Sequence, residues 1–147
     1  PEGQLKITGR KKELFKTSFG KYISPQPIED LFKESLFIDQ IVVVGEHRKF
    51  AGALIVPDFT FLKAYCAVKE IPYTTNAEMV NLPRIRKRFQ VEINRYNKML
   101  GDTEKIKSWE LLDTEWSFET GEITPTLKLK RNVIARKYED KIARLFT

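Results

Sequence analysis

Two short apolar runs dominate the hydrophobic pattern of this chain, at residues 40–45 and 50–56. The first run contains the β-branched stretch Ile41–Val44, which favours a strand over a helix. The polar tetrad Glu46–Lys49 separates the two runs, so we predict an antiparallel hairpin in the core of a sheet. Residues 106–112 predict a third strand.

A shorter β-element is predicted near the N-terminus. Gln4–Thr8 alternates apolar and polar residues, and Glu13–Thr17 follows a charged turn at residues 9–12. This arrangement is typical of a small β-hairpin. The polar segment Thr17–Tyr22 comes next and predicts a loop.

Apolar residues at helical spacing predict the remaining elements. Ser24 is a candidate N-cap, and Pro25 suits the first position of a helix of about three turns. Gly101 is expected to end the longest helix, which begins at residue 81. Two other helices are predicted at residues 59–69, with Val68 among the inward side chains, and at residues 131–146.

The order of these elements indicates an α+β fold. We expect a small antiparallel sheet of about three strands, covered by helices and preceded by an N-terminal β-hairpin. At 147 residues the chain is large enough for one core, and it shows no repeat or long linker. Residues 1–147 are therefore interpreted as a single domain.

Charge and cysteine content narrow the possible functions. The net charge is +6, with basic patches at the N-terminus, at residues 84–88 and at residues 128–137. Such patches suit a nucleotide, a coenzyme, a nucleic acid or an anionic membrane surface. The single Cys66 excludes an internal disulfide and fits a reducing compartment, so we expect a cytoplasmic location, with membrane association left open. With one histidine and one cysteine, no metal site is expected.

The segment Glu122–Arg131 carries the strongest candidate chemistry. Pro125 and its flanking threonines favour a turn before the last helix. Lys128 and Lys130 are separated by one apolar residue, so an extended backbone directs both ammonium groups to the same side. That arrangement suits an anionic reactant, although a lysine-rich loop alone is typical of solvated surface.

A second cluster changes this interpretation. It comprises Gly9–Lys16 followed by Thr17–Pro25 and the pair Ile28-Glu29. Together the two clusters resemble the paired signatures of the C-terminal domain of AMP-forming acyl-CoA synthetases, in the adenylate-forming ANL superfamily. The likeness is strongest to the long-chain fatty acid–CoA ligases, and it covers nearly the whole chain.

The resemblance implies roles for individual residues. Lys128 matches the catalytic lysine of the family pattern Pro-x-Gly-Lys-x-x-Arg, with Leu127 in place of glycine. Lys12 matches the hinge residue, and Arg10 and Lys16 match nucleotide-binding positions. We interpret Lys130 and Arg131 as cations at the start of the last helix. The loop beside the coenzyme A channel is implied to comprise Ser18, Phe19, Gly20 and Lys21, with Phe19 where relatives often carry glycine.

The resemblance also implies an activity. Fatty acid and MgATP would give acyl-adenylate and pyrophosphate, and coenzyme A would then displace AMP. The chain would serve as the mobile domain of such an enzyme, with ATP, Mg²⁺ and coenzyme A used together with a large N-terminal adenylation domain. That domain would supply the phosphate loop and the Mg²⁺ site, so the isolated chain is expected to be inactive.

Two other classes stay open at this point. One is the C-terminal domain of another adenylate-forming enzyme, such as a short-chain ligase or a peptide-synthetase domain. The other is a small basic nucleic-acid-binding module, whose affinity would fall steeply with salt. The aromatic residues lie mainly at core spacing instead of on an exposed stacking face, so we expect no nucleic acid partner.

Overall fold

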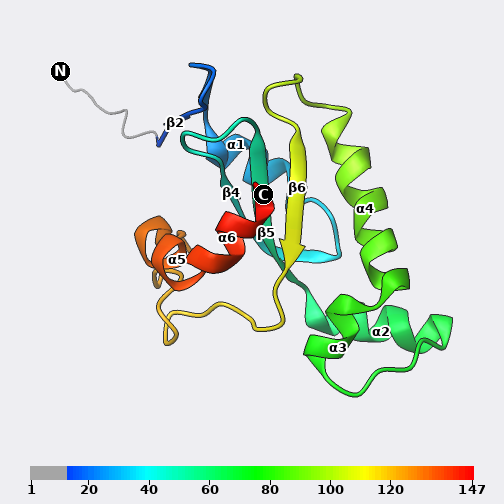
Figure 1. Ribbon diagram of the computed structural model, residues 1–147. Coiled ribbons are helices and arrows are strands. Elements are labelled where there is room, and N and C mark those ends of the chain that lie inside the picture. The colour runs from blue at the N-terminus through cyan, green and yellow to red at the C-terminus, as the bar shows by residue number, and fades with distance from the viewer. Residues whose placement is uncertain (1–12) are drawn as a thin grey trace.

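The computed structural model describes residues 13–147 and contains two small sheets (Figure 1). In the first sheet, β2 (Phe15–Lys16) pairs antiparallel with β3 (Tyr22–Ile23). A hairpin of Gln4–Thr8 with Glu13–Thr17 was predicted; β2 lies in the second of these segments, and its partner β3 begins at Tyr22, the last residue of the segment expected to be a loop. The strand expected at Gln4–Thr8 lies outside the described residues.

The main sheet has the order β4-β5-β6, with β5 in the centre. Strands β4 (Ile38–Val44) and β5 (Ala51–Pro57) form the antiparallel hairpin that the apolar runs predicted. Strand β6 (Ile106–Leu111) pairs with β5 in parallel, so the sheet is mixed and not purely antiparallel. A parallel neighbour needs a long crossover, and the helical segment between β5 and β6 supplies one.

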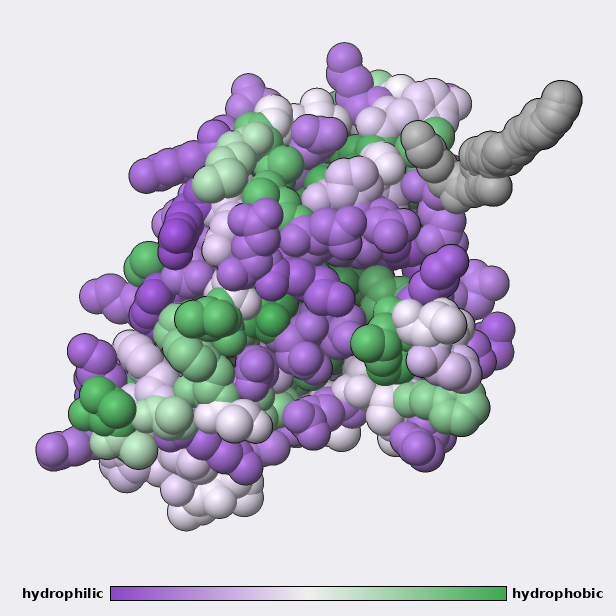
Figure 2. All heavy atoms as spheres, turned by 180° about the vertical axis from the view of Figure 1, so that it is seen from behind, coloured by the Kyte–Doolittle hydropathy of each residue, from purple (hydrophilic) through white to green (hydrophobic). Residues whose placement is uncertain are grey.

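Helices cover both faces of this sheet (Figure 1). Seen from behind, the surface carries mainly hydrophilic side chains, with separate smaller apolar areas between them (Figure 2). Helix α1 (Pro25–Phe32) packs against β4 and contacts α4 (Pro83–Asn97). Helix α2 (Phe59–Lys69) and α3 (Asn76–Asn81) lie at the end of the sheet from which β5 leaves. Every residue of β5 is buried, because helices and strands surround it on all sides.

The last helix differs from its prediction. It is divided into α5 (Arg131–Lys137) and α6 (Glu139–Leu145), which contacts β5 and β6. Tyr138 lies between them with non-helical backbone angles, φ −113° and ψ 27°. Since neither proline nor glycine marks this position, the local sequence carried no signal for the break.

Other boundaries also moved. Helix α3 occupies part of a segment predicted as loop, and α4 ends at Asn97, before Gly101. Val68 was expected to face inward but is exposed. Ser24 precedes α1 as predicted, without a capping hydrogen bond from its side chain. Within the described part of the chain, no helix combines the length and the apolar character needed to span a membrane.

Candidate functional site

Lys128 lies near the tip of a closed turn between β6 and α5. Thr124 N donates to Lys128 O at 2.8 Å, and Leu127 N donates to Thr124 O at 2.8 Å. The Thr124 hydroxyl oxygen accepts a further hydrogen bond from Lys128 N at 3.0 Å. The backbone of Lys128 is therefore held on both sides, while its side chain is exposed.

The turn is closed by a short antiparallel ladder. Ile123 and Leu129 form a β-bridge, and Lys130 N donates to Glu122 O at 2.8 Å. We call the segment from Glu122 to Lys130 the lysine hairpin. Because Ile123 is buried, the hairpin is anchored in the core at its base and exposed at its tip.

The backbone conformation of Leu127 explains why the family pattern has glycine at this position. Its φ of 67° lies in the left-handed region, which glycine adopts without steric cost. The Thr124–Lys128 hydrogen bonds hold this conformation even with a leucine at the position. The change from glycine therefore leaves the turn intact in this chain.

The lysine hairpin forms one wall of a cavity of about 420 Å³. Helix α1 and the start of β4 form the facing walls, and the lining includes Glu29 and Asp30. Within residues 13–147 no carboxylate forms an ion pair with Lys128. Its ammonium group is therefore available to an anion that reaches the cavity from outside this part of the chain.

Arg131, interpreted from the sequence as a simple helix-start cation, has a larger role. Its Nη1 and Nη2 donate to both oxygens of Glu29 at 2.7 and 2.6 Å, and its Nε donates to Glu13 at 2.6 Å. Glu29 also accepts from Val43 N at 2.8 Å. Burial raises the pKa of Glu29, an effect that these hydrogen bonds oppose. Arg131 thus joins the end of the lysine hairpin to α1 and β4.

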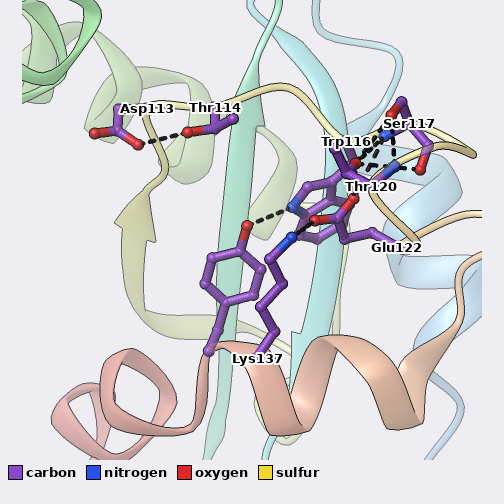
Figure 3. Close-up of polar contacts among 8 residues, drawn as sticks. Asp113, Thr114, Trp116, Ser117, Thr120, Glu122 and Lys137 are labelled. Carbon is purple, nitrogen blue, oxygen red and sulfur yellow. Dashed lines mark hydrogen bonds and ion pairs between the residues drawn. The ribbon is translucent and has the colours of Figure 1, made fainter.

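The base of the lysine hairpin contains a second ion pair (Figure 3). The Glu122 carboxylate is buried and accepts from Lys137 Nζ on α5 and from the Thr120 hydroxyl. Burial opposes ionisation of Glu122, but the hydrogen bonds from Lys137, Thr120 and Ser117 N lower its pKa overall. The same contact raises the pKa of Lys137. Sequence reasoning missed this pair, since an acidic residue in a polar loop is usually solvated.

The second predicted cluster forms a different loop, between β2 and β3. Thr17 N donates to Lys21 O at 2.9 Å and Gly20 N donates to Thr17 O at 3.0 Å, closing a tight turn in which Gly20 has a φ of 82°. Ser18 N donates to the carbonyl oxygen of Arg48, which fixes the turn to the β4–β5 connection. These backbone hydrogen bonds, together with one from Lys21 N to the Thr17 hydroxyl oxygen at 3.2 Å, hold the turn.

Phe19 projects from this loop and is 71% exposed. Phe19 and Lys21 line a shallow cavity of about 280 Å³ together with Lys49 and Lys107. Lys16 Nζ lies 5.5 Å from the ring centre of Tyr22, a cation–π contact on the adjacent strands. With three lysines and one carboxylate, that of Asp102, in its lining, the cavity is basic on balance, and the ring of Phe19 is part of its wall.

Comparison with known proteins decides the family. Residues 13–147 match the model of the AMP-binding enzyme C-terminal domain. The chain belongs to this family. It is 32% identical over 148 residues to the long-chain-fatty-acid–CoA ligase FadD15 of Mycobacterium tuberculosis (strain ATCC 25618 / H37Rv), with 99% of this chain and 24% of that protein covered. It is 33% identical over 149 residues to long-chain-fatty-acid–CoA ligase 5 of Rattus norvegicus, covering 99% and 22%.

Solved structures show the same AMP-binding C-terminal fold. The adenylation domain of a carboxylate reductase from Mycobacterium chelonae superposes with a TM-score of 0.72 at 18% identity, over 90% of this chain and 19% of that one. An acyl-CoA synthetase from Brucella canis gives 0.53 at 14% identity, over 90% and 20%. The α+β fold class is confirmed. This chain spans about a quarter of the length of the curated relatives described above.

In this AMP-binding C-terminal domain, the predicted site residues lie in two places. Lys128 lines the 420 Å³ cavity, whereas Phe19 and Lys21 line the 280 Å³ cavity, and the two share no residue. The predicted roles of Lys128, Phe19 and Lys21 stay predictions, as do those of Ser18, Gly20 and Lys16. Arg10 and the hinge candidate Lys12 lie outside the described residues, although Glu13, directly after the hinge position, contacts Arg131.

The basic helix α4 contributes less free charge than its sequence indicates. Arg86 pairs with Glu110 at 3.1 Å, and its guanidinium carbon lies 5.0 Å from the ring centre of Trp109. Arg88 pairs with Glu92 at 2.8 Å and lies over Phe37. Arg86 and Arg88 are therefore engaged within the domain and are less available to an anionic partner.

Proposed function

We propose that this chain is the mobile C-terminal domain of a long-chain fatty acid–CoA ligase. The observation that carries the proposal is Lys128, which a hydrogen-bonded hairpin presents without any internal ion pair among the described residues. Relatives named as long-chain ligases, at 32% and 33% identity, favour this branch of the adenylate-forming enzymes. The family match also leaves a nucleic-acid-binding module without support.

Lys128 would act in the first half-reaction. A fatty-acid carboxylate attacks the α-phosphorus of ATP, and pyrophosphate leaves. Both reactants are anionic, so a fixed ammonium group holds them together and offsets the charge that develops in the transition state. In such transfers, positioning and electrostatics account for most of the catalysis.

The second loop would act in the other half-reaction. The coenzyme A thiol attacks the acyl carbonyl of the adenylate, AMP leaves, and a thioester forms. In this proposal the domain turns between two orientations, one presenting Lys128 and the other presenting the loop of Ser18–Lys21. The acyl pocket, the phosphate loop and the Mg²⁺ site lie on the adenylation domain, so the isolated chain is inactive.

The test replaces Lys128→Ala in an intact ligase that carries this chain as its C-terminal domain. Adenylate formation is measured by pyrophosphate release, and thioester formation is measured from supplied acyl-adenylate. We expect adenylation to fall by about 100-fold or more, with thioester formation retained. Lys130→Ala, an exposed lysine of the same hairpin, is the matched control. Unchanged adenylation in Lys128→Ala would overturn the proposal for this residue.

A further inference from the structure

Glu122 is a buried carboxylate at the base of the lysine hairpin, and no step of the proposed reaction uses it. Its side chain is only 1% exposed. One carboxylate oxygen pairs with Lys137 Nζ, and the other accepts from the Thr120 hydroxyl and, at 3.4 Å, from Ser117 N (Figure 3). Both oxygens are therefore satisfied in a single arrangement.

The backbone of Glu122 is part of the hairpin itself. Its carbonyl oxygen accepts from Lys130 N, and the next residue forms the bridge to Leu129. Lys128 is held by hydrogen bonds to Thr124 only two residues beyond Glu122. A shift of Glu122 would therefore be passed to Lys128 through a short, hydrogen-bonded path.

The partner of Glu122 is fixed as well. Lys137 is the last residue of α5, directly before the break at Tyr138. The Tyr138 hydroxyl accepts from Trp116 Nε1 at 3.1 Å, and Trp116 is buried. Figure 3 shows the Trp116 indole beside the Glu122–Lys137 pair, with the lysine rising from α5. The ion pair thus joins the hairpin to a helix end that a second contact holds in place.

Burying a charged side chain costs free energy, because the charge loses its contact with water. An apolar side chain of similar size would avoid the loss of solvation, and buried ion pairs are often no more stable than such replacements. A paired and hydrogen-bonded carboxylate does, however, favour one geometry over neighbouring ones, because any shift leaves a buried oxygen without a donor. The desolvation cost of this ion pair is therefore consistent with a hairpin whose geometry matters for its function.

We propose that Glu122 is a positioning residue for adenylation: paired with Lys137, it holds the lysine hairpin in the arrangement that places Lys128 against the reacting carboxylate and phosphate. This inference rests on the proposed function, since it requires Lys128 to act in that step. Glu122 acts through Lys128 and is not itself a catalytic residue.

The first test is Glu122→Gln in the intact ligase. Glutamine keeps the shape of the side chain but loses the charge that pairs with Lys137. We expect kcat for adenylation to fall about 10- to 100-fold, as small misplacements of a catalytic group do, with KM for ATP and fatty acid within roughly twofold. Thioester formation from supplied acyl-adenylate should be unchanged. Glu119→Gln, an exposed acid of the same loop, removes the same charge and should leave both half-reactions intact.

A second variant changes Lys137, the more exposed partner of the ion pair. Lys137→Met removes the partner, whose side chain is 44% exposed, without altering the buried carboxylate. It should reproduce the selective loss of adenylation. The double variant Glu122→Gln/Lys137→Met should be no slower than the slower single variant, because both changes break one contact. Amide exchange should rise at residues 127–130 in each variant and stay unchanged in β4 and β5.

Lys128→Ala is measured beside these variants to separate the two proposals. If it slows adenylation while Glu122→Gln and Lys137→Met do not, the positioning role is overturned and the proposed function stands. If the two variants slow both half-reactions equally, the pair only supports the fold and the positioning role is again overturned. If Lys128→Ala leaves adenylation unchanged, the proposed role of Lys128 and this inference fall together.

Discussion

At the scale of single residues, Leu127 holds a backbone conformation that leucine rarely adopts. Its φ is 67° and its side chain is 65% exposed, so packing of the side chain contributes little stability to offset the backbone strain. The left-handed conformation costs a non-glycine residue about 1–2 kcal/mol. Three hydrogen bonds between Thr124 and residues 127–128 keep it in place.

Leu127→Gly should therefore stabilise the domain. Relief of the strain exceeds the extra freedom that glycine has in the unfolded chain, so we expect a gain of up to about 1 kcal/mol in the free energy of unfolding. Leu36→Gly is the control, because Leu36 is 68% exposed and is not among the described residues with positive φ. Leu36→Gly should lose about 0.4–1 kcal/mol, because glycine has more conformational freedom in the unfolded chain. Urea unfolding followed by circular dichroism measures both, and a loss of stability in Leu127→Gly would contradict the strain argument.

Sequence reasoning found Lys128 but not its supports, for a physical reason. Lysines spaced along a turn are visible in the sequence, and the family pattern marks one of them. The burial of Glu122 depends on how α5 folds back over the hairpin, which local residue types do not reveal. Arg131 was likewise identified only as a helix-start cation, because its partners Glu29 and Glu13 lie more than 100 positions earlier in the chain.

At the scale of elements, Arg131 is the first residue of α5, and its ion pair with Glu29 connects this helix to α1. Glu29 in turn accepts a hydrogen bond from Val43 N, which extends the connection to β4. The Glu29 side chain is 4% exposed and that of Arg131 is 20% exposed, so the pair is mostly removed from water. Loss of one partner would leave the other charge buried without compensation. The helix that follows the lysine hairpin is thereby tied to the opposite side of the 420 Å³ cavity.

Arg131→Met should destabilise the domain by about 3–5 kcal/mol, because it leaves Glu29 buried and unpaired. Arg86→Met is the matched comparison: it breaks the Arg86–Glu110 pair, in which both side chains are about a third exposed. That change should cost about 1 kcal/mol or less. Unfolding in guanidinium chloride measures the difference, and equal losses in the two variants would show that burial of the Glu29 pair has no special effect.

The elements themselves were largely predictable. Strands β4 and β5 followed from two apolar runs and a polar turn, and α2 matched its predicted limits of 59–69. The parallel pairing of β6 did not follow, because side-chain alternation does not encode strand direction. The break at Tyr138 did not follow either, because no proline or glycine marks it; the hydrogen bond that its hydroxyl accepts from Trp116 is a tertiary contact that the local sequence does not reveal.

At the scale of the whole molecule, the two predicted loops lie at separate places on one core. The lysine hairpin and the Ser18–Lys21 loop line different cavities, and each is fixed to the core by its own backbone hydrogen bonds. In the proposed function, a change of orientation of the domain lets each loop act in turn.

Gly20→Ala, a change in the Ser18–Lys21 loop, tests whether the two loops act in different half-reactions. Gly20 has a φ of 82°, while an added Cβ would meet only Lys16 Cε at 3.9 Å, so the change adds backbone strain without a clash. We expect the strain, about 1–2 kcal/mol, to shift the loop and to slow thioester formation by about tenfold. Adenylation in the intact ligase should be unchanged. Gly101→Ala is the control, because that glycine has no positive φ and an added Cβ would meet only Glu104 Oε1 at 3.9 Å.

The two variants together decide whether the loops act in different steps. Lys128→Ala should impair only adenylation, and Gly20→Ala only thioester formation, so their effects should lie on opposite half-reactions of one enzyme. A Gly20→Ala enzyme that is slowed equally in both steps would instead indicate that the loop maintains the docking of the whole domain. Because the loop's hydrogen bond to Arg48 O fixes it to the β4–β5 connection and not to the lysine hairpin, the selective outcome is the one that the fold favours.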